Sequence, residues 1–249
     1  MPAPGAATEK FGGNSPCIEL RLGERLVIFD AGTGLRNLGR DLMARSPVSG
    51  DLLFSHTNFN RICGLPFFAA AFHPGNAFGF WCGHRPEEGS IKEVLTRLMT
   101  DPVFPVPIDI FNAALTFHDF AAGEPFDLGQ GLTVSSMLVS CGLAGTAYRI
   151  DHGGRSLGHA CAVRLPADPA DLLGLLEGCD TLIMSLIEDE VPDADRVLAE
   201  FAAKAGVGRL IVTDYAPDAD DLSLARREGE MAAIFGPTVL AREGHSYAV

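Results

Sequence analysis

The sequence lacks the features that mark membrane-spanning and secreted proteins. Its longest apolar runs are no longer than a strand or are interrupted by glycine and proline, so a membrane-spanning helix is not expected. The start, Met1-Pro-Ala-Pro-Gly, has neither the basic nor the apolar region of a signal peptide. These absences predict a cytoplasmic protein.

Basic residues are also scarce. Lysine and arginine together number 19 against 32 aspartates and glutamates, which gives a formal net charge of −13. A surface with this charge repels nucleic-acid phosphates and anionic lipid headgroups. We therefore expect neither nucleic acid nor a membrane among the partners of this protein.

Paired cysteines are missing as well, because no two cysteines have the Cys-x-x-Cys spacing of a metal or redox motif. Most of the six lie in apolar surroundings, which favours reduced core thiols over a disulfide framework. They are Cys17, Cys63, Cys82, Cys141, Cys161 and Cys179.

The order of strand-like and helix-like segments predicts an α/β protein. With 249 residues, the chain is long enough for one large domain and short for two, so we expect a single domain over residues 1–249. Residues 1–16 are rich in proline, glycine and alanine and predict an irregular lead-in. A β-hairpin follows, with a turn at Gly23-Glu24. Asp30-Ala-Gly-Thr-Gly then breaks the second strand and opens a helix.

The remaining pattern begins with strands and then alternates strands with helices, which is typical of a two-sheet core with outer helices. Helices are expected over residues 35–44, 91–99, 168–177 and 193–205, and strands over residues 51–55, 132–139, 147–150, 157–163, 181–186 and 209–213. Ser90 and Glu93 have the spacing of a capping box.

Several segments together resemble the metallo-β-lactamase-fold superfamily, most closely its cyclic-phosphodiesterase-like and tRNA-processing-nuclease-like branch. Leu26-Val-Ile-Phe-Asp-Ala-Gly-Thr-Gly is similar to the family strand that ends in Asp-Ala-Gly. Ser55-His-Thr-Asn-Phe-Asn-Arg-Ile-Cys-Gly-Leu-Pro-Phe-Phe occupies the place of the metal motif His-x-His-x-Asp-His and the residues after it. The resemblance implies an αββα sandwich. It also implies that the chain starts just after the point where the branch's first strand would end.

The resemblance implies where seven metal ligands of the family would fall. His56 keeps the first motif histidine, whereas the next three positions fall on Asn58, Asn60 and Arg61. A later histidine falls on Cys141, and the last histidine falls on Asp214. The bridging aspartate falls on Ala162 in an ungapped register, or on His159 in a shifted one.

These replacements predict that no pair of metal ions is held, because an amide is a poor zinc ligand and a guanidinium cannot coordinate metal. We therefore expect no metal cofactor. The alternative is one zinc or similar divalent ion, whose ligands would come from His56, Cys141, His159 and Asp214.

A ligand pocket is expected at the positions that the metals would occupy, formed by Asp30, His56, Asn58, Asn60, Arg61, Cys141 and Asp214. Arg61 and Asp214 are expected to form a buried ion pair in place of the second metal. The alternative is that Arg61 receives an anionic ligand with Asp214 orienting it, and both arrangements can hold at once. Asp30, which the resemblance places at the same edge, is expected to pair with Arg61 or His56. His56 and Cys141 are also candidates for a catalytic nucleophile pair.

The sequence thus predicts a non-catalytic binding or regulatory member of the family, whose partner is a small anionic ligand or another protein. The alternatives are a hydrolase or phosphodiesterase with one non-standard metal site, and a scaffold subunit that pairs with an active paralogue. Core packing explains most of the aromatic-rich stretch after the motif, and a wall that lines a ligand site or forms a homodimer explains the remainder. The acidic runs Glu188-Asp-Glu and Asp218–Asp221 are expected to be solvated loop faces.

Overall fold

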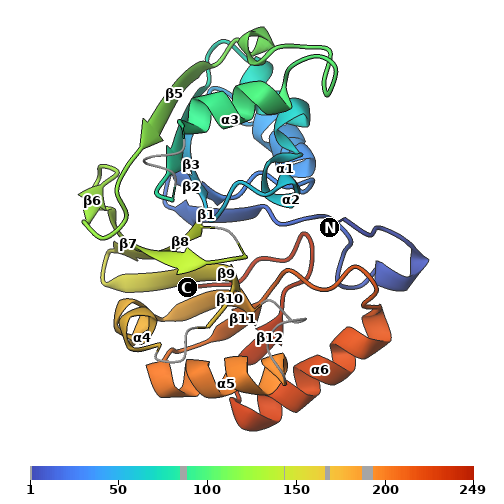
Figure 1. Cartoon of the computed structure of the whole chain (residues 1–249), viewed down its shortest axis with the longest axis vertical. Coiled ribbons are helices and arrows are strands. Elements are labelled where there is room, and N and C mark those ends of the chain that lie inside the picture. Colours follow the sequence, from blue (N-terminus) through green and yellow to red (C-terminus); the bar gives the residue numbers. More distant parts are fainter. Residues whose placement is uncertain (1, 85–88, 143, 166–168, 187–192) are drawn as a thin grey trace. The chain divides into compact units, whose positions relative to one another are not determined.

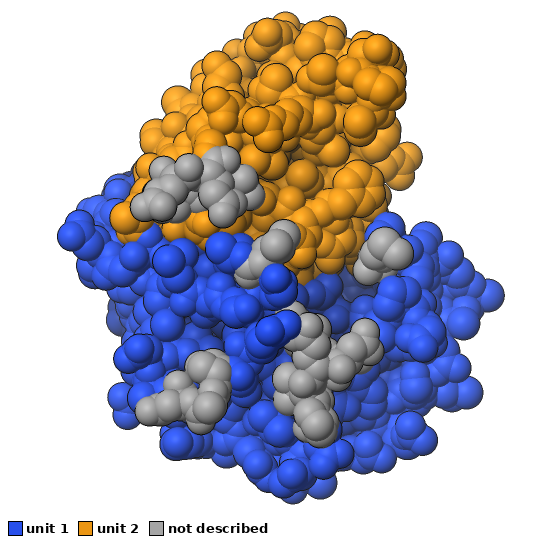
Figure 2. Space-filling model, in the orientation of Figure 1, with its two compact units in different colours: residues 1–13, 122–249 blue, residues 14–121 orange. Residues whose placement is uncertain are grey.

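The computed structural model describes residues 2–84, 89–142, 144–165, 169–186 and 193–249. They form two compact units, which are described separately (Figure 2). Unit 1 comprises residues 1–13 and 122–249, and unit 2 comprises residues 14–121. The single domain expected over residues 1–249 stays a prediction.

Unit 2 is a five-stranded sheet with helices (Figure 1). The strand order is β1-β2-β3-β4-β5; β1 and β2 form an antiparallel hairpin and the other neighbours are parallel. The strands are β1 (Ile18–Leu22), β2 (Arg25–Phe29), β3 (Ser49–Phe54), β4 (Ala77–Cys82) and β5 (Ala114–Asp119). The helices are α1 (Leu35–Met43), α2 (Phe59–Ile62) and α3 (Ile91–Leu98), and the 3₁₀ turns are η2 (Leu65–Phe67), η3 (Ala69–Phe72) and η4 (Ile108–Ile110).

The core of unit 2 lies between one face of this sheet and the helices. Alternate residues of a strand point to the same face, so Phe78 and Phe80 of β4 enter one cluster together with Leu35 of α1 and Leu95 of α3. The aromatic-rich stretch therefore divides into two groups. Phe68, Phe78 and Phe80 are core residues, whereas Phe59, Phe67 and Phe72 are exposed.

Unit 1 is a seven-stranded sheet in the order β12-β11-β10-β9-β8-β7-β6. Neighbours from β6 to β9 are antiparallel and those from β9 to β12 are parallel. The strands are β6 (Phe126–Asp127), β7 (Thr133–Ser140), β8 (Ala144–His152), β9 (Arg155–Val163), β10 (Thr181–Leu186), β11 (Leu210–Val212) and β12 (Thr238–Leu240). The helices are η1 (Ala6–Thr8), α4 (Ala170–Leu176), α5 (Ala194–Ala205) and α6 (Asp221–Ile234). Apolar residues of α4, α5 and α6 share one buried cluster with residues of β9 to β12.

Most expected elements are confirmed within a few residues. Ser90 and Glu93 form the capping box of α3, each through a 3.2 Å hydrogen bond to the other's backbone N–H. Gly206 ends α5 with a φ of 63°, a left-handed conformation that glycine adopts without strain. All six cysteines are thiols. Residues 166–168 and 187–192, which include the expected start of a helix at Asp168 and the run Glu188-Asp-Glu, lie outside the described residues.

The cluster Asp218–Asp221 was expected to be a solvated loop face; Asp218 is exposed, whereas Asp220 and Asp221 begin α6. The Asp220 side chain accepts from the backbone N–H of Ser223 at 2.7 Å and caps α6. The Asp221 carboxylate accepts from the backbone N–H groups of Lys10 and Phe11, at 2.9 and 3.1 Å. Two carboxylates of the cluster therefore hold local structure. Within the described residues, no helix has the length and hydrophobicity needed to cross a membrane.

Candidate functional site

In unit 2, the site begins where β2 and β3 end. These strands are parallel, so the residues that follow them lie at the same edge of the sheet. Asp30 follows β2 with a φ of 62°, a left-handed conformation that aspartate tolerates better than most residues. Its carboxylate accepts from the backbone N–H of Ser55 at 2.8 Å and from the Ser55 hydroxyl at 2.7 Å. Asp30 is fully buried and is held rigidly by the end of β3.

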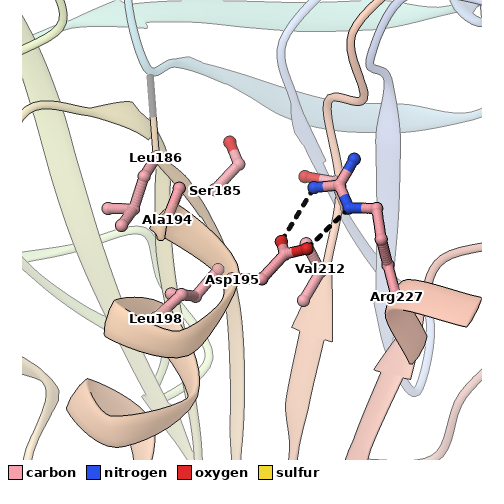
Figure 3. A pocket seen from close by; sticks show the side chains of 8 residues that line it. Ser185, Leu186, Ala194, Asp195, Leu198, Val212 and Arg227 are labelled. Atoms are coloured by element: carbon pink, nitrogen blue, oxygen red, sulfur yellow. Dashed lines mark hydrogen bonds and ion pairs between the residues drawn. The ribbon is translucent and has the colours of Figure 1, made fainter. Parts of the chain in front are cut away.

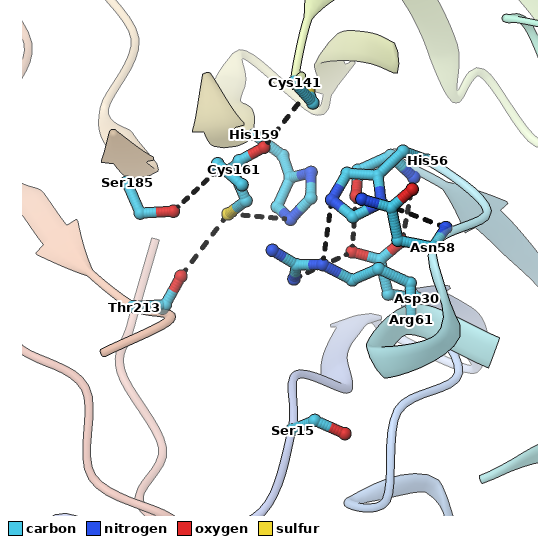
Figure 4. A network of polar contacts seen from close by, with 12 residues as sticks. Ser15, Asp30, His56, Asn58, Arg61, Cys141, His159, Cys161, Ser185 and Thr213 are labelled. Atoms are coloured by element: carbon cyan, nitrogen blue, oxygen red, sulfur yellow. Dashed lines mark hydrogen bonds and ion pairs between the residues drawn. The ribbon is translucent and has the colours of Figure 1, made fainter. Parts of the chain in front are cut away.

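Arg61 of α2 is also fully buried, and it bonds to two of the predicted site residues (Figure 4). Its Nη1 lies 3.3 Å from Oδ2 of Asp30, and its Nε donates to Nε2 of His56 at 3.3 Å. The expected pairing of Asp30 with Arg61 is therefore confirmed. A permanent cation stands where the resemblance implies a motif histidine, and the Asp30 carboxylate lies beside it.

The imidazole of His56 faces N–H groups on both of its ring nitrogens. Besides Arg61 at Nε2, the backbone N–H of Asn58 lies 3.3 Å from Nδ1. A neutral imidazole accepts at one nitrogen only, so these two donors compete for one lone pair. That lone pair is the one with which a histidine would bind a metal. The contacts to His56 therefore oppose metal binding within unit 2.

Asn58 and Asn60 lie on the same segment, Asn58 just before α2 and Asn60 within it. Both side chains are half-buried amides. Desolvation, together with the negative charges of Asp30 and Glu19, raises the pKa of the nearby Cys17 thiol.

In unit 1, a second group of polar side chains surrounds the end of β9 (Figure 4). His159 and Cys161 are two residues apart on this strand and share a face, with Sγ of Cys161 3.4 Å from Nε2 of His159. The same sulfur lies 3.3 Å from Oγ1 of Thr213. The Cys141 thiol donates to the carbonyl oxygen of Cys161 at 3.6 Å. All four residues are buried.

Ala162, the other position considered for the bridging aspartate, has a left-handed backbone with a φ of 54°. Its N–H donates to the Ser185 hydroxyl at 2.7 Å, beside a register irregularity between β9 and β10. Asp214, just after β11, is also left-handed with a φ of 65°. Unlike aspartate, alanine has no local preference for this conformation, so the backbone at Ala162 is strained.

The structure therefore brings together part of the predicted set in each unit. Asp30, His56 and Arg61 contact one another in unit 2. Cys141 and His159 both contact Cys161 in unit 1. Because Arg61 and His56 belong to unit 2, and Asp214 and Cys141 to unit 1, the Arg61–Asp214 ion pair and the His56–Cys141 nucleophile pair stay predictions.

Sequence reasoning missed Cys161 and Thr213. The signal for Cys161 was its two-residue spacing from His159 inside a strand, which places both side chains on one face. Thr213 directly precedes Asp214 at the end of a buried strand, and only the tertiary structure brings it to Cys161.

A small polar hollow in unit 1 lies beside the ends of β10 and β11 (Figure 3). The guanidinium of Arg227 donates two hydrogen bonds to the Asp195 carboxylate there, at 2.7 and 2.8 Å. The hollow encloses about 10 Å³, which is room for one water molecule. It is therefore too small to be a ligand site.

The resemblance implies a metal ion at these residues. In the part of the chain that the structure describes, no three side chains of histidine, cysteine, aspartate or glutamate are grouped so that they could hold an ion. In unit 2 the amides of Asn58 and Asn60 and the guanidinium of Arg61 stand at motif positions. This donor set does not fit the dinuclear centre that the resemblance implies.

Comparison with solved structures shows the fold of this chain. No family model matches the chain, and no curated protein matches it. Among solved structures, the chain is similar to the metallo-β-lactamase fold protein YhfI from Bacillus subtilis, with a TM-score of 0.69 and 16% identity over 99% of this chain and 95% of that one. A diphosphatase from the PhnP family has a TM-score of 0.66 and 15% identity over 94% of this chain and 84% of its own. Human tRNase Z, short form (ELAC1), has a TM-score of 0.64 and 13% identity over 100% of this chain and 96% of its own. At these identities the similarity shows the fold.

Proposed function

We propose that this protein, which has the metallo-β-lactamase fold, is a non-catalytic member that acts by binding a small anionic ligand. The observation that carries the non-catalytic part of the proposal is the buried Arg61, bonded to Asp30 and His56 where the resemblance places a motif histidine. A hydrolase of this fold needs imidazoles and carboxylates there. Here the segment offers one imidazole, and Arg61 donates to it.

The chemical consequence concerns the attacking water. A bound zinc ion lowers the pKa of its water from 15.7 to about 7 and so supplies a nucleophile at neutral pH. Changing a residue that merely supports a metal ligand already costs about 10–100-fold in metal affinity. Replacing the ligands themselves by Asn58, Asn60 and Arg61 costs more, so this chain is expected to lack the metal-activated nucleophile.

A second candidate is a hydrolase that uses one soft ion or a thiol nucleophile. The contact between Cys161 and His159, at 3.4 Å, favours it, because thiolate and imidazole together suit zinc and a histidine can activate a thiol. Burial of Cys161, which is 1% exposed, opposes direct attack on a substrate. We therefore place this candidate second.

Turnover assays test the proposal against this second candidate. The full chain is incubated with bis-(p-nitrophenyl) phosphate, a β-lactam and a thioester, before and after chelator treatment and after readdition of zinc or manganese. The proposal expects no turnover above background in any of these conditions. Turnover that the chelator abolishes and added metal restores would contradict it. Loss of that turnover in Cys161→Ala would then assign it to the second candidate.

A further inference from the structure

A cavity of about 320 Å³ opens in unit 2 beside the start of α1. This volume lies at the lower end of the range for sites that bind small organic molecules. The residues that line it come from the lead-in before β1, the turn after β2, the first turn of α1 and the segment around η2. They are Asn14, Thr33, Arg36, Asn37, Gly64 and Phe67.

Side chains, rather than the backbone of α1, provide the polar character of this cavity. The first backbone N–H groups of α1 are already bonded, Leu35 to the carbonyl oxygen of Gly32, Arg36 to that of Thr33 and Asn37 to that of Gly34. The first turn of α1 carries no acidic residue. A cation near a helix N-terminus is electrostatically unfavourable, and an anion beside it relieves this repulsion.

Arg36 is the cation of the cavity. Among the described residues, no carboxylate pairs with it, whereas Arg25 and Arg61 of the same unit pair with Asp51 and Asp30. Its planar guanidinium presents several N–H donors in the geometry that carboxylates and phosphates accept. In a protein of net charge −13, a small anion needs such a local positive charge.

Phe67 gives the cavity an apolar wall. Phe67 is 54% exposed, so its ring is accessible to a ligand. Phe104 packs edge-to-face against it, with ring centroids 5.9 Å apart, and this contact restricts the ring. Thr33 is also held in place, because its hydroxyl oxygen accepts from the backbone N–H of Ser15 at 2.9 Å. The cavity therefore combines a cation and polar groups with a restricted aromatic ring.

We infer that this cavity binds a small anion that carries a planar apolar ring, with its charged group on Arg36 and its ring against Phe67. The inference deepens the proposed function, on which it rests, by placing the anionic ligand here. Arg61 is less suited to that ligand, since it is fully buried and bonded to Asp30 and His56. Arg36 is exposed and lies on the cavity wall.

Titration calorimetry of the full, chelator-treated chain with phenyl phosphate tests this inference. The variants are Arg36→Ala and Phe67→Ala, and the matched control is Arg40→Ala, an exposed arginine of the same helix that does not line the cavity. We expect saturable binding that weakens about 10-fold or more in Arg36→Ala, as for a lost charge-assisted hydrogen bond. Phe67→Ala should weaken phenyl phosphate binding several-fold, and Arg40→Ala should change it less than about twofold.

The inference is overturned if the unaltered chain does not bind phenyl phosphate saturably. It is also overturned if Arg40→Ala weakens binding as much as Arg36→Ala does, or if Phe67→Ala leaves the affinity unchanged. Circular dichroism of each variant shows that it is folded. Because the protein is free of metal in this experiment, its outcome is separate from the turnover assays. Metal-dependent turnover would contradict the proposed non-catalytic function without changing the affinities for phenyl phosphate.

Discussion

Arg61 and Asp30 form an ion pair at 3.3 Å in which both side chains are completely shielded from solvent. The desolvation of two charges offsets much of their attraction, so such a pair contributes little net stability. Removing one partner is strongly destabilising, because it leaves the other charged and buried. The pair therefore fixes Arg61 beside His56.

Arg61→Ala is expected to lower the free energy of unfolding by about 3–5 kcal/mol, because it strands the Asp30 carboxylate. Urea denaturation of the purified variant measures this change. The control is Arg21→Ala, which removes a partly exposed pair with Glu19 and should cost at most about 1 kcal/mol. If the two variants lose similar stability, loss of Arg61 does not leave a destabilising buried charge on Asp30.

A double-mutant cycle tests the expected contact between Arg61 and Asp214. Stability is measured for Arg61→Ala, Asp214→Ala and the double variant. Residues in one ion-pair network show coupling energies of about 0.5–3 kcal/mol, and we expect a value in this range. Additivity within about 0.3–0.5 kcal/mol, as found for distant sites, would show that the two side chains do not interact.

Ala162→Gly should stabilise the protein by about 0.5–1 kcal/mol, because glycine adopts the left-handed backbone at this position without steric cost. The control is Ala160→Gly, two residues earlier in β9, where the strand conformation and the loss of a buried methyl group both make glycine unfavourable. Thermal or urea unfolding compares the two variants. A destabilised Ala162→Gly would contradict the strain assigned to this position.

Stability in acid should depend on Glu228 of α6. Hydrogen bonds from Arg242, at 2.7 and 2.9 Å, together with one from the backbone N–H of Leu240, lower the pKa of this carboxyl below its usual value of 4.5. Glu228 therefore contributes stability that is fully present above about pH 4.5 and is lost as the pH falls through the lowered pKa.

Glu228→Gln should thus unfold with a weaker pH dependence between pH 5 and pH 2, as measured by denaturation at a series of pH values. Glu230→Gln changes an exposed residue of the same helix and serves as the control. An unaltered pH dependence in Glu228→Gln would show that the carboxyl does not stabilise the folded state in this way.

Local patterns predicted much of the fold. The hairpin, the capping box at Ser90 and the break at Asp30 depend on neighbouring residues, so they can be predicted from the sequence. Strand β4 was missed because its aromatic residues were interpreted as a cluster. The two-residue spacing of the buried Phe78 and Phe80 is that of one face of a strand. Helix α6 was missed because its capping residue, Asp220, lies within an acidic run.

The site was less predictable, because its contacts join residues that are distant in sequence. The motif positions indicated that Arg61 had replaced a metal ligand, and Asp30 was one of several possible partners. Only the fold shows that Asp30 is held by Ser55 and faces Arg61. In the same way, the approach of Thr213 to Cys161 depends on tertiary packing across 52 residues of sequence.

We propose that replacement of the motif ligands prevents this chain from holding the two ions of a metallo-β-lactamase-fold hydrolase. Elemental analysis of the full chain, purified without chelator from medium containing zinc, manganese and iron, tests it most directly. The account predicts well below one equivalent of each metal per chain. Two tightly held equivalents per chain, retained through dialysis, would contradict it.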